Sequence, residues 1–184
     1  MRSLLIFWLG AGLCVGCQSY SWKSSVPSEM RTVSVGVFAN ESDVPELGSA
    51  VARQISRELQ REGTFQIVSP DTCAIEVQGI VRSAHSSVNG YSRRTGSRLR
   101  DYHLTTVAEV SFIDKRAGRV WVDGRKYTAQ TSFTAGDDLL TGARDASGRI
   151  AADLARQVVD DLRAEAASAS TDTAAERDTT DVSR

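Results

Sequence analysis

Alternation of apolar and polar residues over three long segments is the feature that most limits what this chain can fold into. The pattern covers residues 73–81, 102–114 and 119–133. A period of two places successive side chains on opposite faces of a sheet, so these segments predict strands with one buried face. The middle segment is the clearest, and its apolar positions include Leu104, Ala108, Val110 and Phe112. Residues 114–118 predict a hairpin loop, and Gly124 predicts a bulge in the returning strand.

The first half of the chain predicts two more strands and a helix. Residues 31–38 form a strand that places Val33, Val35 and Val37 on one parity and therefore on one buried face. Residues 65–68 form a short strand. Between them a helix begins at Pro45 and ends at Gly63, with an apolar residue at every fourth position: Leu47, Val51, Ile55 and Leu59.

A second helix is predicted after residue 136, because the apolar positions return to helical spacing: Leu139, Ala143, Ala146, Ile150, Leu154, Val158 and Leu162. Residues 166–184 contain Val182 as their one large apolar residue and predict a disordered tail. The order of elements is therefore β-α-β-β-β-β-α. It predicts one α+β domain, residues 31–165, with two helices packed on one face of a mostly antiparallel four- to five-stranded sheet.

The N-terminus has the composition of an export signal. In residues 1–16, Arg2 precedes an apolar run that is too short to span a bilayer stably. The run ends in Val15-Gly16-Cys17, which resembles a bacterial lipobox. The resemblance implies cleavage after Gly16 and acylation of the Cys17 thiol and amino group, which together anchor a protein stably. Residues 17–30 would then be a lipidated linker, and Gln18 resembles the signal for release to the outer membrane.

Two alternatives to this anchor remain open at the level of sequence. A permanent anchor helix would need about 20 consecutive apolar residues, and polar residues follow Cys17 at once. A soluble export signal would leave Cys17 as a free thiol. If Cys17 is lipidated and Cys14 leaves with the signal, Cys73 has no cysteine to pair with, and we expect it to be a small core residue.

Composition argues against several classes of function. The chain has 22 Lys and Arg against 23 Asp and Glu, a formal net charge of -1, which speaks against nucleic-acid binding through overall charge. Its two histidines, His85 and His103, stand outside any zinc-ligand spacing, and no G-x-S-x-G motif occurs. We therefore expect no metal, no cofactor and no catalytic residue. Each histidine is interpreted as a residue on the surface of a strand.

Positive charge is concentrated in residues 82–101. This segment has five arginines and one aspartate, a net charge of +4, so the remainder of the chain carries -5. It has neither a helical stripe nor a full strand pattern and predicts a long exposed hairpin tip. The tip is either a solvated loop without a partner or an anion site, since several guanidinium groups can bind one polyanionic head group. The candidate residues are Arg93, Arg94, Arg98 and Arg100.

Taken together, these features resemble the LptE family of lipopolysaccharide-assembly lipoproteins. The likeness starts with a lipidated cysteine followed by aromatic residues in Cys17-Gln18-Ser19-Tyr20-Ser21-Trp22 and continues through the strand at 32–40 and the helix near Pro45. The strands at 75–81 and 102–107, Phe133 and the closing helix extend it to about Leu162. The chain departs from the usual family pattern at Gln18 and Val26.

The resemblance implies a non-enzymatic subunit on the periplasmic side of the outer membrane. Such a subunit sits in the lumen of the outer-membrane barrel LptD, assists its assembly and contacts lipopolysaccharide. A second class of protein remains an alternative. Periplasmic interaction lipoproteins of the curli-secretion or penicillin-binding-protein-activator type are also similar to this chain at residues 33–40, at the helix that follows and at residues 63–68. An exported hydrolase has only scattered serines and the two histidines in its favour.

Overall fold

The computed structural model describes residues 26–91, 100–136 and 138–181. The predicted signal segment 1–16, the predicted lipidation site Cys17 and most of the linker 17–30 lie outside the described residues. So do three of the four arginines predicted to bind anions, namely Arg93, Arg94 and Arg98.

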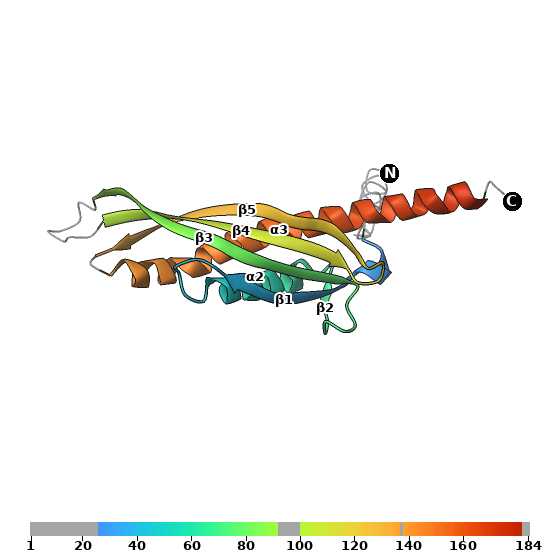
Figure 1. Ribbon diagram of the computed structural model, residues 1–184, viewed down its shortest axis with the longest axis horizontal. Coiled ribbons are helices and arrows are strands. Elements are labelled where there is room, and N and C mark those ends of the chain that lie inside the picture. Colours follow the sequence, from blue (N-terminus) through green and yellow to red (C-terminus); the bar gives the residue numbers. More distant parts are fainter. Residues whose placement is uncertain (1–25, 92–99, 137, 182–184) are drawn as a thin grey trace, which may run out of the picture.

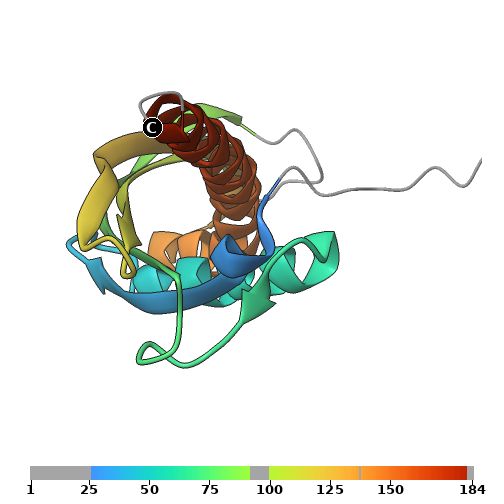
Figure 2. The same ribbon diagram turned by 90° about the vertical axis from the view of Figure 1, so that its right-hand side faces the viewer.

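Five strands form a single sheet in the order β2-β1-β3-β4-β5 (Figure 1). β1 is parallel to both of its neighbours, and β3, β4 and β5 are antiparallel. The sheet curves so that α2 lies beside β1 and α3 lies beside β5 (Figure 2). The predicted α+β class, with two helices on a mostly antiparallel sheet, is confirmed. The elements are η1 Ser28–Met30, β1 Thr32–Asn40, α2 Leu47–Glu62, β2 Gln66–Ile67, β3 Ile75–Tyr91, β4 Arg100–Asp114, β5 Arg119–Ala135 and α3 Leu139–Asp181.

The core lies between the inner face of the sheet and the two helices. Along β4 every second residue from Tyr102 to Asp114 is buried, as the alternation predicts. The predicted stripe of α2 is buried at all four positions, and Gly63 ends that helix with φ 76°. In α3 the buried stripe begins at Ala143, because Leu139 and its neighbour Leu140 are exposed at the first turn.

The two turn predictions for the second half of the sheet are also confirmed. The carboxylate of Asp114 accepts hydrogen bonds from the backbone N–H groups of Arg116 and Ala117, at 2.9 and 3.0 Å, and closes the β4–β5 hairpin. Gly118 and Gly124 have positive φ values of 64° and 57°. The pairing of β4 with β5 shifts register close to Gly124, which is the predicted bulge.

One prediction for β1 is wrong. Val37 was expected on the buried face, but 91% of its surface is exposed and Phe38 is buried instead. The register of β1 against β3 shifts between Val35 and Phe38, so the strand gains one residue and its parity changes. The ring of Phe38 lies over Gly79, where an added Cβ would be 2.6 Å from the ring. The missing side chain at Gly79 makes room for the aromatic residue.

The predicted long, exposed hairpin over residues 82–101 is present, but strand pairing extends further into both of its described ends than the sequence predicts. β3 continues to Tyr91, and β4 begins at Arg100, which pairs with Tyr91. Two register shifts, beside Val81 and beside Val88, blur the alternation in this part of β3. Few of its side chains enter the core, so the strand is held by backbone pairing with β4 rather than by an apolar pattern.

The structure also differs from the predicted disordered tail. α3 continues through Ala166 to Asp181 and extends past the end of the sheet in Figure 1. Ala166 and Ala169 are buried. Alanine has the highest intrinsic helix propensity, so an alanine-rich segment can continue an established helix without a large apolar stripe.

α2 can approach β1 closely only because residue 48 is glycine. A Cβ at Gly48 would lie 2.5 Å from the backbone oxygen of Phe38 and 3.1 Å from that of Ala39. Nothing lies within 4 Å of the corresponding position at Gly148, which is in the exposed part of α3.

We predict opposite effects for alanine at these two helical glycines. Gly48→Ala should lower the free energy of unfolding by about 2 kcal/mol or more, because α2 must move away from β1. Gly148→Ala should raise it by about 0.5 to 1 kcal/mol, because alanine is the better helix former. Urea unfolding of both variants measures the difference. Equal effects of the two changes would contradict the close approach of α2 to β1.

Candidate functional site

One end of the domain carries the single predicted site residue that the structure describes. Arg100 is exposed and begins β4, where it pairs with Tyr91 of β3 and Ala135 of β5. We call this the hairpin end. The other end of β4 lies near the start of the domain, since the Arg116 guanidinium is 3.5 Å from the backbone oxygen of Glu29 in η1. We call this the linker end (Figure 1).

The two ends are far apart. β4 runs from Arg100 to Asp114, and a rise of about 3.3 Å per residue makes it about 45 Å long. Val26, the first described residue, and Met30 are buried at the linker end. The chain therefore leaves the N-terminal linker and enters the core on the side of the molecule opposite to Arg100.

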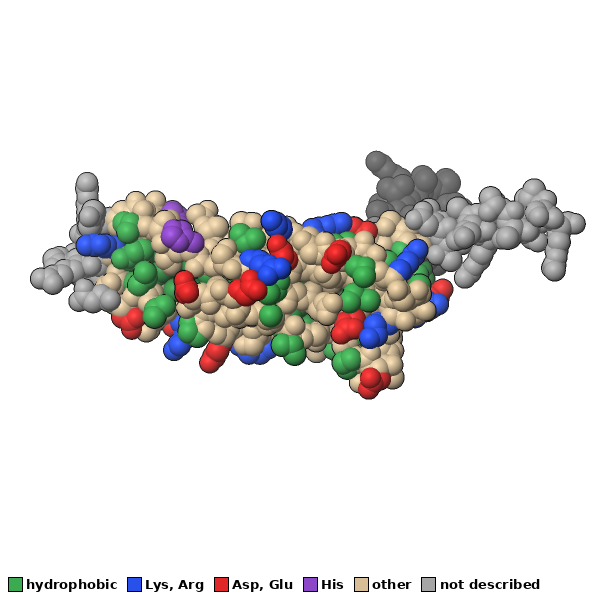
Figure 3. Space-filling model, in the orientation of Figure 1, with side chains coloured by type: hydrophobic (Ala, Val, Ile, Leu, Met, Phe, Trp, Pro, Cys, Tyr) green, Lys and Arg blue, Asp and Glu red, His purple; other side chains and the backbone are tan. Residues whose placement is uncertain are grey.

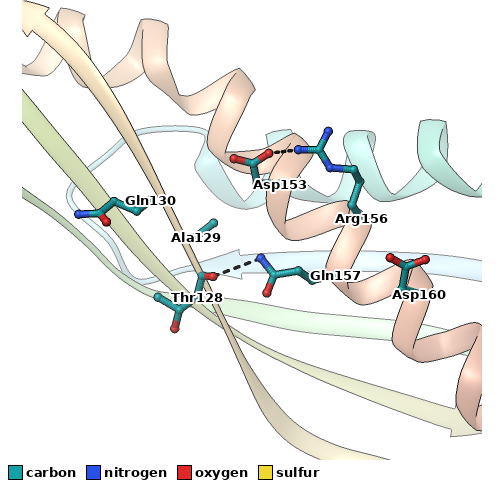
Figure 4. Close-up of a pocket in the computed structure, with 7 residues that line it drawn as sticks. All are labelled: Thr128, Ala129, Gln130, Asp153, Arg156, Gln157 and Asp160. Carbon is teal, nitrogen blue, oxygen red and sulfur yellow. Dashed lines mark hydrogen bonds and ion pairs between the residues drawn. The ribbon is translucent and has the colours of Figure 1, made fainter.

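A shallow polar groove lies between β5 and α3. Its volume is about 410 Å³. Figure 4 shows Gln157 of α3 reaching toward β5, where its amide donates to the backbone oxygen of Thr128 at 3.2 Å. Arg156 pairs with Asp153 on its own helix. The groove thus has no unpaired basic group to attract an anion. The residues that line it are Thr128, Ala129, Gln130, Asp153, Arg156, Gln157 and Asp160.

The groove is part of a longer polar contact along the free edge of the sheet. α3 has a polar residue at every fourth position from 149 to 165, directly beside its apolar stripe. We call these residues the polar stripe, and they are Arg149, Asp153, Gln157, Asp161 and Glu165. Arg149 donates to the backbone oxygen of Ser132 at 2.9 Å, as Gln157 does to that of Thr128. These bonds occupy outward-facing carbonyl groups that an edge strand otherwise offers to a neighbouring chain.

The polar stripe ends in a charged cluster that links α3 to β5. Arg125 donates to Asp161 at 2.7 Å and to Glu165 at 2.8 Å, and the Tyr127 hydroxyl donates to Asp161 at 2.6 Å. Burial and the hydrogen bond to Asp161 raise the pKa of Tyr127. Burial alone would raise the pKa of Asp161, but the bonds from Tyr127 and Arg125 outweigh it and lower that pKa.

Other chemistry-bearing residues are ordinary structural groups. Cys73 is buried, and burial raises the pKa of its thiol, which disfavours the reactive thiolate. His85 and His103 lie on the outer face of β3 and β4, and a ring nitrogen of His103 is 3.0 Å from the Ser132 hydroxyl. Their interpretation as strand-surface residues is confirmed. Within the described part of the chain, no three His, Cys, Asp or Glu side chains form a possible metal site.

The comparison with known families decides the identity of this fold. The LptE family model, described as lipopolysaccharide-assembly, matches residues 30–162. This span runs from η1 to the middle of α3 and includes every strand of the sheet. The chain belongs to the LptE family. The resemblance noted in the sequence is confirmed, and LptE-family proteins are non-enzymatic lipoproteins of the cell envelope.

Solved structures share the fold at low sequence identity. A protein of Xanthomonas campestris aligns with a TM-score of 0.54 and 12% identity, covering 79% of this chain and 92% of that one. A neuraminyllactose-binding hemagglutinin homolog of Helicobacter pylori aligns with a TM-score of 0.50 and 10% identity, covering 81% and 94%. No curated protein matches the sequence. Among the described helices, none is long and apolar enough to cross a membrane.

The sequence predicts an anion site in the basic segment 82–101 but does not predict the contact between α3 and β5. The signal for that contact was present, because the polar residues of α3 repeat every four positions on one flank of its apolar stripe. Such a flank normally faces solvent. Only the placement of β5 as an edge strand beside α3 gives four of these five side chains, all but Asp153, their partners.

We predict that Asp161 stabilises the domain in a pH-dependent manner. Because its pKa is lowered on folding, its contribution is complete above the unfolded-state pKa of about 3.9 and is lost as the pH falls through the lower folded value. Asp161→Asn should cost about 1 kcal/mol at pH 7, since the cluster is partly exposed, and this cost should shrink toward pH 2.

Urea unfolding between pH 7 and pH 2 measures this effect, with Asp160→Asn as the matched control. Asp160 is the neighbouring, more exposed carboxylate and is 3.4 Å from Arg163 on the same helix. Its substitution should change stability little at any pH. A cost of Asp161→Asn that stays constant down to pH 2 would contradict the role of the Asp161 charge.

Proposed function

We propose that this protein is an outer-membrane lipoprotein that assists assembly of an LptD barrel, plugs its lumen and contacts lipopolysaccharide during transfer to the outer leaflet. The match of the LptE family model to residues 30–162 carries this proposal. The match covers all five strands, α2 and the first half of α3 rather than one short motif. It favours this function over a curli-secretion or penicillin-binding-protein-activator role.

The anchor is the first part of the proposal. Residues 1–16 act as a lipoprotein signal, and acyl chains on Cys17 hold the protein on the periplasmic side of the outer membrane. Eight residues lie between Cys17 and Val26, which is buried in the core, so nine residue steps join the two. An extended chain of that length reaches about 30 Å at most, which keeps the lipid near the linker end of the domain.

The arginine segment is the second part. Residues 92–99 join Tyr91 to Arg100 and contain Arg93, Arg94 and Arg98. The strand ends that carry this segment lie about 45 Å along β4 from the linker end. This arrangement supports a division in which one end attaches to the membrane lipid and the other meets the transported lipopolysaccharide. Guanidinium groups match the phosphates of lipid A, and several are needed because an exposed ion pair contributes only about 0 to 1 kcal/mol.

We predict that the double variant Arg93→Glu/Arg94→Glu binds lipopolysaccharide about tenfold more weakly than the parent, a loss of about 1.4 kcal/mol. Binding of purified protein to lipopolysaccharide at low and moderate salt measures this effect, and the remaining binding should be less sensitive to salt. The same variant should still copurify with the barrel after mild detergent extraction, because folding is unaffected.

The matched control reverses two exposed arginines elsewhere. Arg53 and Arg57 lie on the solvent side of α2, so their joint substitution by Glu changes the net charge equally. This control should bind lipopolysaccharide as the parent does. Parental affinity in the Arg93 and Arg94 variant would refute the lipid contact, whereas absence of the barrel from the parent preparation would refute the partner.

A further inference from the structure

The half of β3 near the hairpin end is an open edge of the sheet. β1 pairs with β3 only as far as Asn40, opposite Val81, where the Glu41 N–H also donates to the Val81 backbone oxygen at 2.9 Å. Beyond this point β3 continues to Tyr91 with β4 as its one neighbour among the described strands (Figure 1). Residues 83–88 keep one regular register with β4 between two register shifts. We call residues 83–88 the free edge.

The direction of the backbone groups along the free edge follows from the other side of the sheet. The carbonyl groups of Thr128 and Ser132 in β5 point outward to α3, so the residues of β4 bond alternately to β5 and to β3. Through the register, this leaves the backbone N–H and C=O groups of Ala84, Ser86 and Val88 pointing away from β4. These donors and acceptors have no partner within the described part of the chain.

The free edge has none of the residues that usually protect an edge strand. Proline and charged side chains, lysine above all, discourage the addition of another strand. Residues 83–88 read Ser-Ala-His-Ser-Ser-Val, without lysine, arginine, a carboxylate or proline. The β5 edge is closed, because Arg149 and Gln157 of α3 occupy its outward carbonyl groups. The chain therefore shields one long edge of its sheet and leaves the other able to pair.

The inner face beside the free edge is incompletely covered. Val88 lies opposite the buried Tyr102, whose ring stacks on that of Phe133 at a centroid distance of 5.5 Å. Val88 thus continues an apolar row, yet 54% of its surface is exposed. α2 begins beside Phe38 and runs toward the linker end, and α3 lies on β4 and β5. Figure 3 shows hydrophobic side chains at the surface of the hairpin end, to the left of the histidines. An added strand would complete both the backbone hydrogen bonds and the apolar row.

The two ends of the described chain are both distant from the free edge. Val88 lies about 40 Å along β3 from Ile75, which is opposite Asp114 at the linker end. With cleavage at the predicted site, residues 17–25 start from Val26 at that end and reach about 30 Å at most. α3 also runs toward the linker end and extends past it in Figure 1. The strand that fits the free edge therefore comes from another chain.

We propose that the free edge binds an extended segment of the barrel protein, which adds a strand to the sheet. This inference rests on the proposed function, in which the barrel surrounds the domain. The wall strands of a closed barrel already pair with one another, so the segment is a loop or a terminus that reaches into the lumen. Its backbone bonds to Ala84, Ser86 and Val88, and an apolar side chain at the position opposite Val88 covers that residue.

Amide hydrogen exchange at single-residue resolution tests this contact in the free full chain and in the complex extracted with the barrel. In the free protein the outward amides of Ala84, Ser86 and Val88 should exchange fast, whereas the His85 amide, which bonds to β4, should exchange slowly. The barrel should slow the three outward amides by about 100-fold.

The other outcomes of this measurement contradict the added strand. Unchanged exchange of the outward amides in a recovered complex would overturn it and leave the proposed function standing. Slowing by lipopolysaccharide alone, or slowing that grows with the concentration of the free protein, would assign the edge to the lipid or to a second copy and would also overturn it. Failure to recover any barrel would refute the proposed function, and this inference with it.

A pair of substitutions at one position supplies a second measurement. Ser86→Pro removes an outward N–H and obstructs the free edge without removing a bond to β4, so the amount of copurified barrel should fall about tenfold. Ser86→Ala keeps the N–H group and is the matched control, with parental barrel recovery expected. Parental recovery with a folded Ser86→Pro variant, or equal losses from both variants, would overturn the proposal. If proline unfolds the hairpin, the exchange measurement on the unaltered chain decides.

Discussion

The contact between α3 and the sheet is the interaction on which the rest of the structure depends. A sheet of long antiparallel strands has an apolar face and an open edge, and both must be shielded from water or from other chains. α3 does both with two adjacent stripes of residues. Its apolar stripe, including Ile150, Leu154 and Val158, is buried against the inner face, and its polar stripe bonds to β5. One helix therefore determines which surfaces of the sheet remain available.

Those remaining surfaces explain how the domain could work in an envelope assembly. The inner face is occupied by α2 and α3, and the β5 edge is closed by side chains of α3. The outer face and the hairpin end are left, and they differ in chemistry, since the outer face carries ion-paired residues of both signs, such as Arg82 with Glu109, and the hairpin end carries Arg100. In the proposed function, the lipid anchor lies near the linker end and the hairpin end meets the anionic lipid.

The sequence predicts the fold wherever one side of an element is buried. β4 alternates at every position and α2 has a complete apolar stripe, so both follow from periodicity alone. The exposure of Val37 could not be predicted, because the extra residue in β1 depends on the pairing of that strand with β3. The second half of β3 was missed because its stability comes from backbone bonds to β4. For the candidate site, charge segregation in the sequence points to the arginines of residues 82–101, which stay a prediction, whereas the contact of the polar stripe of α3 requires the placement of β5 as an edge strand.

Native-state hydrogen exchange on the purified protein most directly tests the claim that α3 holds the β5 edge. The outward direction of the Thr128 and Ser132 carbonyl groups means that the alternate residues, Ala129 and Thr131, bond to β4. The contact with α3 predicts that the amide protons of Ala129 and Thr131 exchange only by global unfolding, with the same free energy as those at the centre of β4. Exchange of these β5 amides through a local opening of lower free energy would contradict that claim.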